Sequence, residues 1–491
     1  MRKLVLLFVL LLMPACVCAA SAWKFVSTMP NPRYSNAACL GPDGKIYVMG
    51  GVVIDRSHLE LCYYDGRFSN LVYDPKTNKW KYLIPVPGFG PPGGSLGTIY
   101  DKKADKYVAC SYVRLDQKIV NSIFRKYGIY GLTHLLTSKI VRENNLVLTV
   151  DCGGKVTRLP PGKTANDMDW IRKTDFQRTG VGVDAVAAKD GRIWWIGGSG
   201  PWKPFTGGPA ENIVLPYDPA RNAWIDVTTR VHWHGHRPPE AIYHTKVPPM
   251  HERRMDARAV TASDGKVYVM GGWRRLGGDW RLTYFMAGPR IVERKYERPA
   301  KDEGRAVSDT MECYDPRTNK WEYRKPLSSP RMEFAAAIGP DNKIYVFGGF
   351  AGWAQDKSTP VLATTEVYDP KTDTWSERKP MPEPRVFDTA VYAANGKIYV
   401  IGGQRSLHSP PLASVLIYDP VKNSWKRGPS MNVPRGSPAA VATPDGKIYV
   451  IGGTSVGAYP MRKKVNWFLP RGDQLDAGKV LASAEVLNVF K

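Results

Sequence analysis

The chain has 491 residues and a formal net charge of +24, with 43% hydrophobic and 11% aromatic residues. This apolar content excludes a disordered chain, and the 46 glycines and 40 prolines follow no three-residue period, which excludes collagen. Abundant glycine, proline, tryptophan and tyrosine is typical of many short strands joined by tight turns.

The first segment predicts a secretory signal peptide over residues 1–22. A basic start precedes an apolar run from Leu4 to Met13, and small residues end the segment at Ala22. This pattern is typical of an exported protein, whereas a membrane span needs roughly 20 apolar residues. An uncleaved anchor and a lipid on Cys16 are the alternatives. We therefore expect a secreted, periplasmic or cell-surface protein with a mature chain over 23–491.

One phrase recurs six times in the rest of the chain. Each copy joins a turn pair such as Asp-Gly or Asn-Gly to a short apolar run and a pair of glycines. The copies are Asp43–Gly51, Asp190–Gly198, Asp264–Gly272, Asp341–Gly349, Asn395–Gly403 and Asp445–Gly453. The turn pair accepts the positive φ of a two-residue hairpin, and the apolar run predicts a buried strand.

A second phrase follows the first five copies and begins Tyr-Asp-Pro. It ends on a tryptophan seven residues after the tyrosine, at Trp80, Trp224, Trp321, Trp375 and Trp425. Asp-Pro begins a tight turn, and tryptophan fills the space between adjacent sheets. Each unit is therefore predicted to be a four-stranded sheet that must pack on its neighbours, which a closed ring achieves.

The order of apolar strand, double glycine, tyrosine and tryptophan resembles the kelch motif, so the mature chain is expected to be a kelch β-propeller. Blades of about 50 residues leave room for two blades between Gly51 and Gly198, the second degenerate and built around Lys106–Cys110. We predict an all-β, seven-bladed propeller with six clear blades and one degenerate blade. The last unit lacks a tryptophan, so the N-terminal strand with Trp23 is expected to close the ring.

Long segments interrupt the repeat. Each follows a glycine pair or a tryptophan, so all are expected on one face, formed by the second-to-third strand loops and the links between blades. We call this the insertion face. The main insertions are 111–145, 225–253, 273–306 and 454–481, with a shorter one at 52–70. Periodicity in 111–145 predicts two short helices, which act as a lid or a membrane-surface element. Loops on a rigid scaffold commonly carry function, although decorative loops are the alternative.

Charge gathers in these insertions. Segments 111–145, 273–306 and 454–481 together contribute eleven of the net positive charges. An arginine also recurs at the predicted start of the innermost strand, at Arg33, Arg254, Arg331, Arg385 and Arg435. A ring of guanidinium groups at the channel mouth would bind carboxylate, sulfate or phosphate. Alternatively, these arginines bond backbone carbonyls of the neighbouring blade.

Five of the eight histidines lie in the 225–253 insertion. Alternation on an extended segment predicts that His232, His234 and His236 share one side, with His232 and His236 as ligand contacts. Tyr243 with His234 or His244 is a candidate acid–base pair. A solvated polar loop is the alternative. No complete metal-ligand pattern is present, and no cofactor is expected.

Three enzyme families offer weaker resemblances. Tyr243-His244 is similar to part of the copper radical oxidase site, although the other ligands cannot be matched. Exported bacterial kelch propellers that act as sialic-acid mutarotases, and propeller lyases of uronic-acid polymers, are further precedents for an acidic sugar.

We therefore predict a secreted, monomeric kelch propeller that binds an anionic extracellular ligand, an acidic glycan or an acidic protein segment, on its insertion face. The alternative is an enzyme on acidic sugars, a lyase or an epimerase or mutarotase, with a copper radical oxidase less favoured. Nucleic acid is not an expected partner, and membrane contact is expected only through a lipid anchor or a basic segment.

Overall fold

The computed structural model describes residues 21–30, 32–53, 70–83, 95–101, 106–112, 147, 149–152, 155–158, 161–162, 182–198, 212–225, 228–234, 237–244, 246–275, 281–287, 290–297, 305–350, 360–455 and 480–490. Every regular element in these ranges is a β-strand, as the sequence predicted. Within the same ranges, no helix has the length and apolarity to cross a bilayer. The helices predicted within 111–145 lie outside the described residues, except that Ser111 and Tyr112 end a β-strand. The predicted signal peptide falls almost wholly outside it and stays a prediction.

Six antiparallel sheets of four strands each form the blades of a ring. Blade I contains β3 (Ala37–Leu40), β4 (Ile46–Met49), β6 (Leu71–Asp74) and β7 (Lys79–Tyr82). Blade II contains β12 (Val183–Ala187), β13 (Ile193–Gly197), β14 (Val214–Asp218) and β15 (Ala223–Trp224). Blade III contains β18 (Arg258–Thr261), β19 (Val267–Met270), β24 (Met311–Asp315) and β25 (Lys320–Arg324).

The other three blades come from the C-terminal part of the chain. Blade IV contains β26 (Ala335–Ile338), β27 (Ile344–Phe347), β28 (Thr365–Asp369) and β29 (Thr374–Arg378). Blade V contains β30 (Thr389–Tyr392), β31 (Ile398–Ile401), β32 (Val415–Asp419) and β33 (Ser424–Arg427). Blade VI contains β34 (Ala439–Ala442), β35 (Lys447–Ile451), β36 (Ala484–Asn488) and the N-terminal β1 (Trp23–Phe25).

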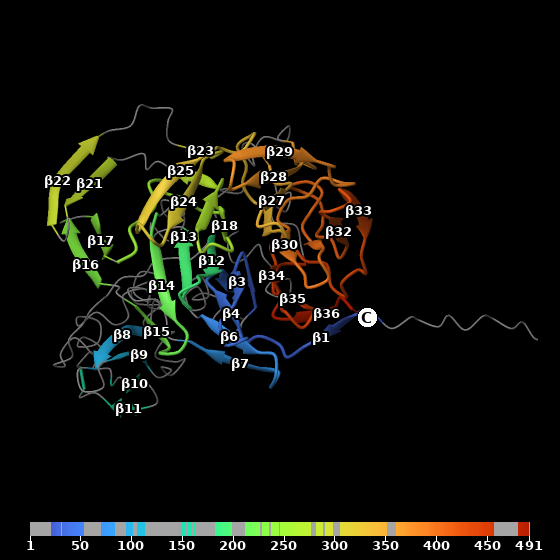
Figure 1. Ribbon diagram of the computed structural model, residues 1–491. Helices are drawn as coiled ribbons and strands as arrows, with labels where there is room; N and C mark the ends of the chain where they lie inside the picture. The colour runs from blue at the N-terminus through green and yellow to red at the C-terminus, as the bar shows by residue number, and fades with distance from the viewer. Residues whose placement is uncertain are drawn as a thin grey trace, which may run out of the picture.

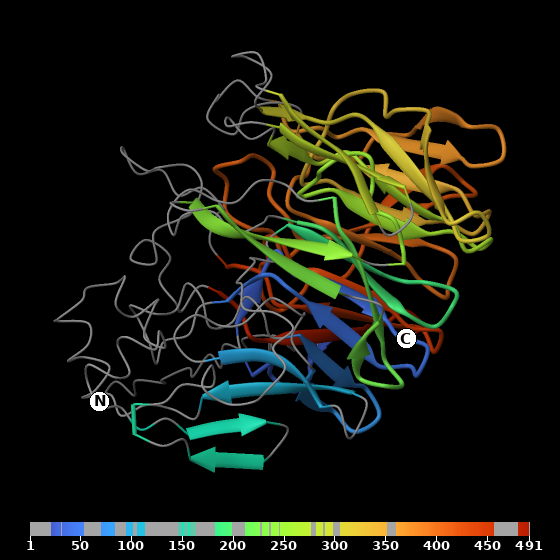
Figure 2. The ribbon, with the colours of Figure 1, turned by 90° about the vertical axis from the view of Figure 1, so that its left-hand side faces the viewer.

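The innermost strands contact one another in the cyclic order β3, β12, β18, β26, β30, β34 and back to β3, so the ring has six blades (Figure 1). The predicted degenerate blade does form a four-stranded sheet, of β8 (Ser95–Asp101), β9 (Lys106–Tyr112), β10 (Thr149–Cys152) and β11 (Lys155–Arg158). That sheet lies outside the ring and touches it where β9 meets β15. Figures 1 and 2 both show these cyan and teal strands at the lower edge of the molecule. The prediction of seven blades is therefore wrong.

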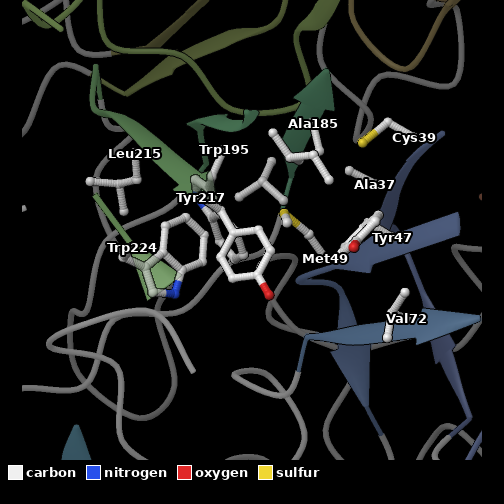
Figure 3. Close-up of a cluster of buried hydrophobic side chains, with 12 residues drawn as sticks. Ala37, Cys39, Tyr47, Met49, Val72, Ala185, Trp195, Leu215, Tyr217 and Trp224 are labelled. Atoms are coloured by element: carbon white, nitrogen blue, oxygen red, sulfur yellow. The ribbon is translucent and has the colours of Figure 1, made fainter. Parts of the chain in front are cut away.

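The reason for six blades lies in the aromatic packing between sheets. At every junction except that between blades V and VI, an aromatic residue on the second strand of one blade contacts the tyrosine on the third strand of the next. Tyr47 of blade I meets Tyr217 of blade II at 6.0 Å between ring centroids, which leaves no place for a sheet between them. Figure 3 shows this shared core. The same contact joins Tyr449 of blade VI to Tyr73 of blade I at 5.7 Å and completes the circle.

The N-terminal strand makes the same contacts as the fourth strands of the other blades. β1 pairs with β36 in antiparallel register, with Trp23 opposite Leu487. The buried Trp23 indole donates a hydrogen bond from Nε1 to the Pro429 carbonyl at 2.9 Å. Trp80 makes the equivalent bond to the Ser27 carbonyl at 2.8 Å. Trp23 thus occupies in blade VI the place that the other tryptophans occupy in their own blades.

The described insertions leave the ring from the predicted face. Two hairpins, β16 (Thr228–His234) with β17 (Arg237–His244) and β21 (Arg281–Ala287) with β22 (Arg290–Glu297), lie outside the blades in Figure 1. The first hairpin is part of a link between blades, and the second is part of a second-to-third strand loop. Short ladders also form there, between β2 (Arg33–Tyr34) and β5 (Val52–Val53) and between β20 (Trp273–Arg275) and β23 (Arg305–Val307).

Candidate binding site at the mouth of the axial channel

An axial channel runs between the six innermost strands. The second residue of β3, β18, β26, β30 and β34, and of β12 in the equivalent register, is alanine: Ala38, Ala259, Ala336, Ala390, Ala440 and Ala185. These small side chains allow six strands to converge on one axis. The space they line has a volume of about 130 Å³, and Asp184, Arg258 and Thr389 also line it.

The entrance to this channel is built by one residue per blade with a left-handed backbone, two positions before the aligned start of each innermost strand. Their φ angles lie between 47° and 66°, at Ser35, Gly182, Asp256, Glu333, Phe387 and Ser437. The amide of Ser35 donates to the Ser437 carbonyl at 3.1 Å, and the amide of Phe387 donates to the Glu333 carbonyl at 3.0 Å. These bonds join neighbouring blades around the entrance and hold its residues in place.

We call the residues around this entrance, Ser35, Asn36, Gly182, Val183, Asp256, Arg258, Glu333, Ser437 and Pro438, the channel mouth. Its charged members are the carboxylates of Asp256 and Glu333 and the guanidinium of Arg258, and Asp184 lies just inside. Arg258 Nε donates to the Phe334 carbonyl at 2.6 Å, and Asp184 accepts from the amide of Ala259 at 2.7 Å. Three carboxylates therefore surround one guanidinium.

The electrostatics of the mouth reflect this excess of acids. Burial raises the pKa of Asp256 to about 6, and Arg258 only partly opposes the rise. Burial also raises the pKa of Glu333 well above its usual range, and the nearby charge of Asp256 adds to it. The ionised forms thus lack sufficient compensating charge, which a cationic group entering the mouth would supply.

A fourth acid lies beside the mouth in blade V. Asp388 is 1% exposed, and neither carboxylate oxygen has a hydrogen-bond partner among the described residues. Burial raises the pKa of Asp388 to about 7, although Arg385 favours its ionised form. Asn36, in the equivalent position of blade I, likewise has both side-chain polar atoms buried without a partner in the described part of the chain.

Sequence reasoning missed these carboxylates. Asp256 and Glu333 each stand two residues after an arginine of the recurring series, in Arg-Met-Asp and Arg-Met-Glu. That spacing was the available signal, because the arginine marks the approach to the innermost strand.

The five recurring arginines themselves do not face the channel. Arg33, Arg254, Arg331, Arg385 and Arg435 are all 0% exposed. Each donates from Nη1 to the carbonyl of the first glycine of the glycine pair in its own blade. The distances are 3.1 Å to Gly50, 2.9 Å to Gly271, 3.4 Å to Gly348, 2.6 Å to Gly402 and 2.7 Å to Gly452.

The backbone of each arginine makes a second, inter-blade connection. Its carbonyl accepts from the amide of the second glycine of the preceding blade, from Gly198, Gly272, Gly349, Gly403 or Gly453, at 2.8–2.9 Å. Each arginine therefore ties its own blade to the one before it. This corrects the predicted ring of ligand-binding guanidinium groups. As the alternative proposed, the side chains donate to backbone carbonyls, but these carbonyls belong to the same blade and not to the neighbouring one.

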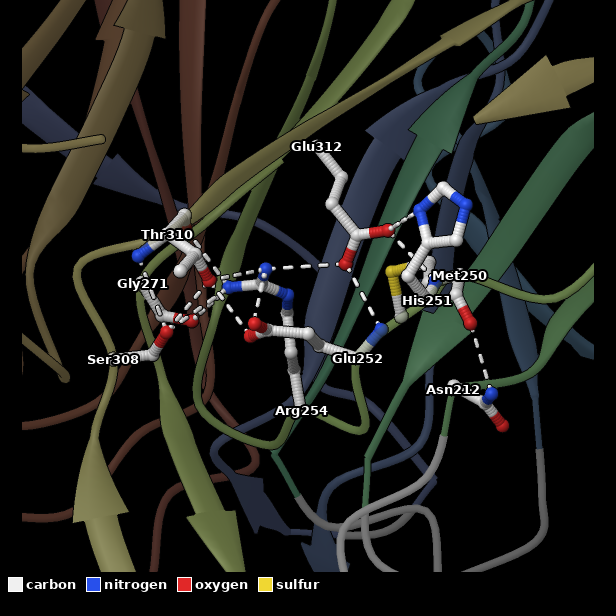
Figure 4. Close-up of polar contacts among 9 residues, drawn as sticks. All are labelled: Asn212, Met250, His251, Glu252, Arg254, Gly271, Ser308, Thr310 and Glu312. Atoms are coloured by element: carbon white, nitrogen blue, oxygen red, sulfur yellow. Dashed lines mark hydrogen bonds and ion pairs between the residues drawn. The ribbon is translucent and has the colours of Figure 1, made fainter. Parts of the chain in front are cut away.

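Carboxylates that are buried or nearly so pair with four of these arginines, Arg254, Arg331, Arg385 and Arg435. Figure 4 shows Arg254 between Glu312 and Glu252. Its Nη2 lies 3.1 Å from Glu312 Oε1 and 3.2 Å from Glu252 Oε2. Glu312 also accepts from the backbone amide of His251 at 2.7 Å and lies 2.9 Å from its Nδ1. His251 stacks on Tyr323 at 5.0 Å between ring centroids. This cluster is a structural anchor for the link into blade III.

Three other histidines of the 225–253 insertion lie on the β16–β17 hairpin. His232 and His234 are in β16, Tyr243 and His244 are in β17, and His236 falls outside the described residues. Tyr243 pairs with Thr229, which is five residues before His234. At about 3.3 Å per residue, the hairpin separates Tyr243 from His234 by roughly 16 Å, so it does not assemble that acid–base pair. Among the described residues, no three His, Cys, Asp or Glu side chains converge on a metal position.

Comparison with known proteins gives the class of this fold. A family model described as the KLHDC2/KLHL20/DRC7 Kelch-repeats domain matches residues 258–466, and a Kelch motif model matches residues 32–87. The chain belongs to the kelch-repeat family.

Individual relatives match part of the chain. It is 31% identical to the human Kelch repeat and BTB domain-containing protein 12, over 30% of this chain and 22% of that protein. It is 27% identical to Kelch-like protein 26 of Danio rerio, over 44% of this chain and 35% of that protein. It is 34% identical to beta-scruin of Limulus polyphemus, over 50% of this chain and 21% of that protein. The matches thus span at most 35% of the length of these relatives.

These comparisons correct the predicted location. The relatives are Kelch-like proteins, a Kelch repeat and BTB domain-containing protein and a scruin, and none of these names describes an exported protein. A secreted, periplasmic or cell-surface location is therefore not retained.

Proposed function

We propose that this kelch propeller is a protein-binding module whose partner docks on the insertion face and inserts a lysine or arginine side chain into the channel mouth. The observation that carries the proposal is the placement of Asp256 and Glu333 around Arg258 at the open end of the channel. Two acids beside one base, with Asp184 beneath, outnumber the available positive charge, and burial raises the pKa of all three carboxyl groups. An entering cation would stabilise their ionised forms.

The dimensions of the channel restrict what can enter. The channel has a volume of about 130 Å³ and the mouth one of about 20 Å³, so the mouth admits no more than the tip of one side chain and no element of secondary structure. Since the six alanines narrow the axis below the mouth, the rest of a partner must lie on the insertion face. The hairpins β16–β17 and β21–β22 extend the area available there.

An anionic ligand is the second candidate, and the favouring observation is charge. Segments 111–145, 273–306 and 454–481 carry eleven net positive charges. The arginine series no longer supports this candidate, because all five side chains are buried. An acidic glycan or acidic protein segment would bind to these insertions and not to the channel mouth.

The two candidates are separated by fluorescence anisotropy with labelled twelve-residue peptides, one rich in Lys and Arg, one rich in Asp and Glu, and one neutral. The test variant is Asp256→Asn with Glu333→Gln. The matched control is Asp190→Asn, in a turn on the opposite face, where an amide oxygen can still accept from the Arg192 amide. We expect the basic peptide to bind and the double variant to weaken it at least tenfold, with the control unchanged.

Each outcome has a distinct meaning. Binding of the acidic peptide that is insensitive to the mouth variant would favour the second candidate. Basic-peptide binding that survives the mouth variant unchanged, or no peptide binding in any arm, would reject the proposal. Affinity for the basic peptide should fall between 50 and about 300 mM salt, because a partly exposed ion pair is screened.

A further inference from the structure

The sheet outside the ring contains two cysteines in a particular arrangement. Along the ladder between β9 and β10, Tyr112 pairs with Val150, Ser111 with Asp151, and Cys110 with Cys152. Both strands are interior strands of the sheet, since β8 flanks β9 and β11 flanks β10. The two cysteines are 42 positions apart in the sequence. They occupy directly opposite backbone positions.

Directly opposite residues of an antiparallel pair share a face of the sheet, with Cα atoms about 4.5 or 5.5 Å apart. Disulfides join Cα atoms at roughly 4.4–6.8 Å, so both spacings satisfy the requirement without backbone movement. We propose that Cys110 and Cys152 form a reversible cross-strand disulfide, with a small-molecule disulfide of the glutathione type as the oxidant.

The chemistry is thiol–disulfide exchange. The thiolate of one cysteine attacks a sulfur of oxidised glutathione, which forms a mixed disulfide and releases one glutathione thiolate. The second cysteine loses its proton and attacks the protein sulfur of the mixed disulfide, which releases the second glutathione. Two protein thiols are oxidised to one disulfide, and one glutathione disulfide is reduced to two thiols.

The position of the pair gives the crosslink a structural consequence. It would join the two interior strands of a sheet that lies outside the ring and meets it where β9 contacts β15. In this sheet no glycine pair follows the second strand β9, unlike in the six blades, and the Tyr-to-Trp phrase is absent. A covalent link therefore stabilises the part of the described chain with the least repeat packing, and it also closes the loop that contains the basic 111–145 insertion.

The ring provides internal controls. Cys39 in β3 and Cys313 in β24 are both buried and free. Burial raises the pKa of both thiols, which keeps them protonated and unreactive in the folded protein. Oxidation would therefore favour Cys110 and Cys152 over these two thiols of the ring.

The test uses the full-length protein, equilibrated without denaturant in buffers with graded ratios of reduced to oxidised glutathione. Free thiols are then alkylated with N-ethylmaleimide, and the intact mass and the tryptic peptides are measured. We expect oxidation to remove two alkyl groups and to yield a peptide that joins Cys110 to Cys152. Hydrogen exchange in β9 and β10 should slow roughly 100-fold on oxidation, within the usual effect of a disulfide.

Variants make the assignment specific. Cys110→Ser and Cys152→Ser should each abolish the linked peptide, whereas Cys62→Ser should leave it intact. If both cysteines are alkylated at every glutathione ratio in the wild-type protein, the proposal is overturned. A linked peptide that joins either cysteine to Cys62 would equally overturn it.

Discussion

The buried arginine of blade VI offers a direct test of the structural role assigned to the series. Arg435 donates to the carbonyls of Gly452 at 2.7 Å and Ser483 at 2.9 Å. Its Nη2 lies 2.9 Å from Glu485 Oε1, and both side chains are 0% exposed. The perturbation is Arg435→Met, which retains most of the aliphatic length and removes the charge and every donor.

The cost follows from what the substitution leaves behind. Glu485 would keep its bonds from the backbone amides of Asn432 and Val433 and lose its cation. A buried ion whose partner is removed destabilises a protein by about 3–5 kcal/mol. We expect Arg435→Met to lower the free energy of unfolding by about 4 kcal/mol. The double variant Arg435→Met with Glu485→Gln should lower the free energy of unfolding by less, about 2 kcal/mol, because no uncompensated charge remains.

The assay is urea unfolding followed by tryptophan fluorescence, with the midpoint and slope compared across variants. Arg427→Met is the matched control, since that side chain is 63% exposed and lies 3.7 Å from Glu383. Its effect should be below about 1 kcal/mol. An Arg435→Met protein as stable as this control, or a double variant less stable than Arg435→Met alone, would refute the structural role.

Three further predictions concern the ring and its acids. Trp23→Ala should lower the free energy of unfolding by about 3–5 kcal/mol, measured by thermal or urea unfolding. The indole is 2% exposed and donates to Pro429 in the link between blades V and VI. An effect below 1 kcal/mol would mean that β1 contributes little to blade VI. Gly403→Ala should destabilise far more than Gly191→Ala, although φ is 84° and 83°. A Cβ at Gly403 would lie 2.7 Å from a backbone oxygen, whereas one at Gly191 meets nothing within 4 Å. Equal midpoints would contradict this. In the folded state burial raises the pKa of Asp388 to about 7, above the 3.9 of an unfolded chain. Its stabilising contribution is therefore complete below about pH 4 and lost as pH rises to about 7. Asp388→Asn should reduce the difference in urea midpoint between pH 5 and pH 8, and an unchanged difference would disprove the assignment.

Much of the fold was predictable because its signals are local. The pair Asp43-Gly44 forms a tight hairpin turn that depends only on neighbouring residues, and φ at Gly44 is 74°. The Tyr-to-Trp spacing likewise encodes a third and a fourth strand joined by a tight turn. In that turn Asn78 takes φ of 54° and accepts from Tyr73 Oη at 2.8 Å. The placement of the insertions on one face followed from strand order alone.

The number of blades could not be read from the same signals. The chain between Gly51 and Gly198 is long enough for two blades, and it does contain a four-stranded sheet. Whether that sheet joins the ring depends on which surfaces meet. Tyr47 and Tyr217 are 170 positions apart in the sequence, yet their contact closes the ring without it.

The candidate site was likewise only partly predictable from the sequence. A sequence identifies the arginine series by spacing, but it does not show that Arg33 bonds to a carbonyl 17 residues later and is fully buried. It also does not show that Asp256 and Glu333, from two different blades, meet at one channel mouth around Arg258. By itself the sequence determined the repeating unit, because hydrogen bonds and turns within one sheet are short-range. Only the tertiary structure decided the ring size, the buried role of the arginines and the charge of the mouth, since these depend on contacts between blades.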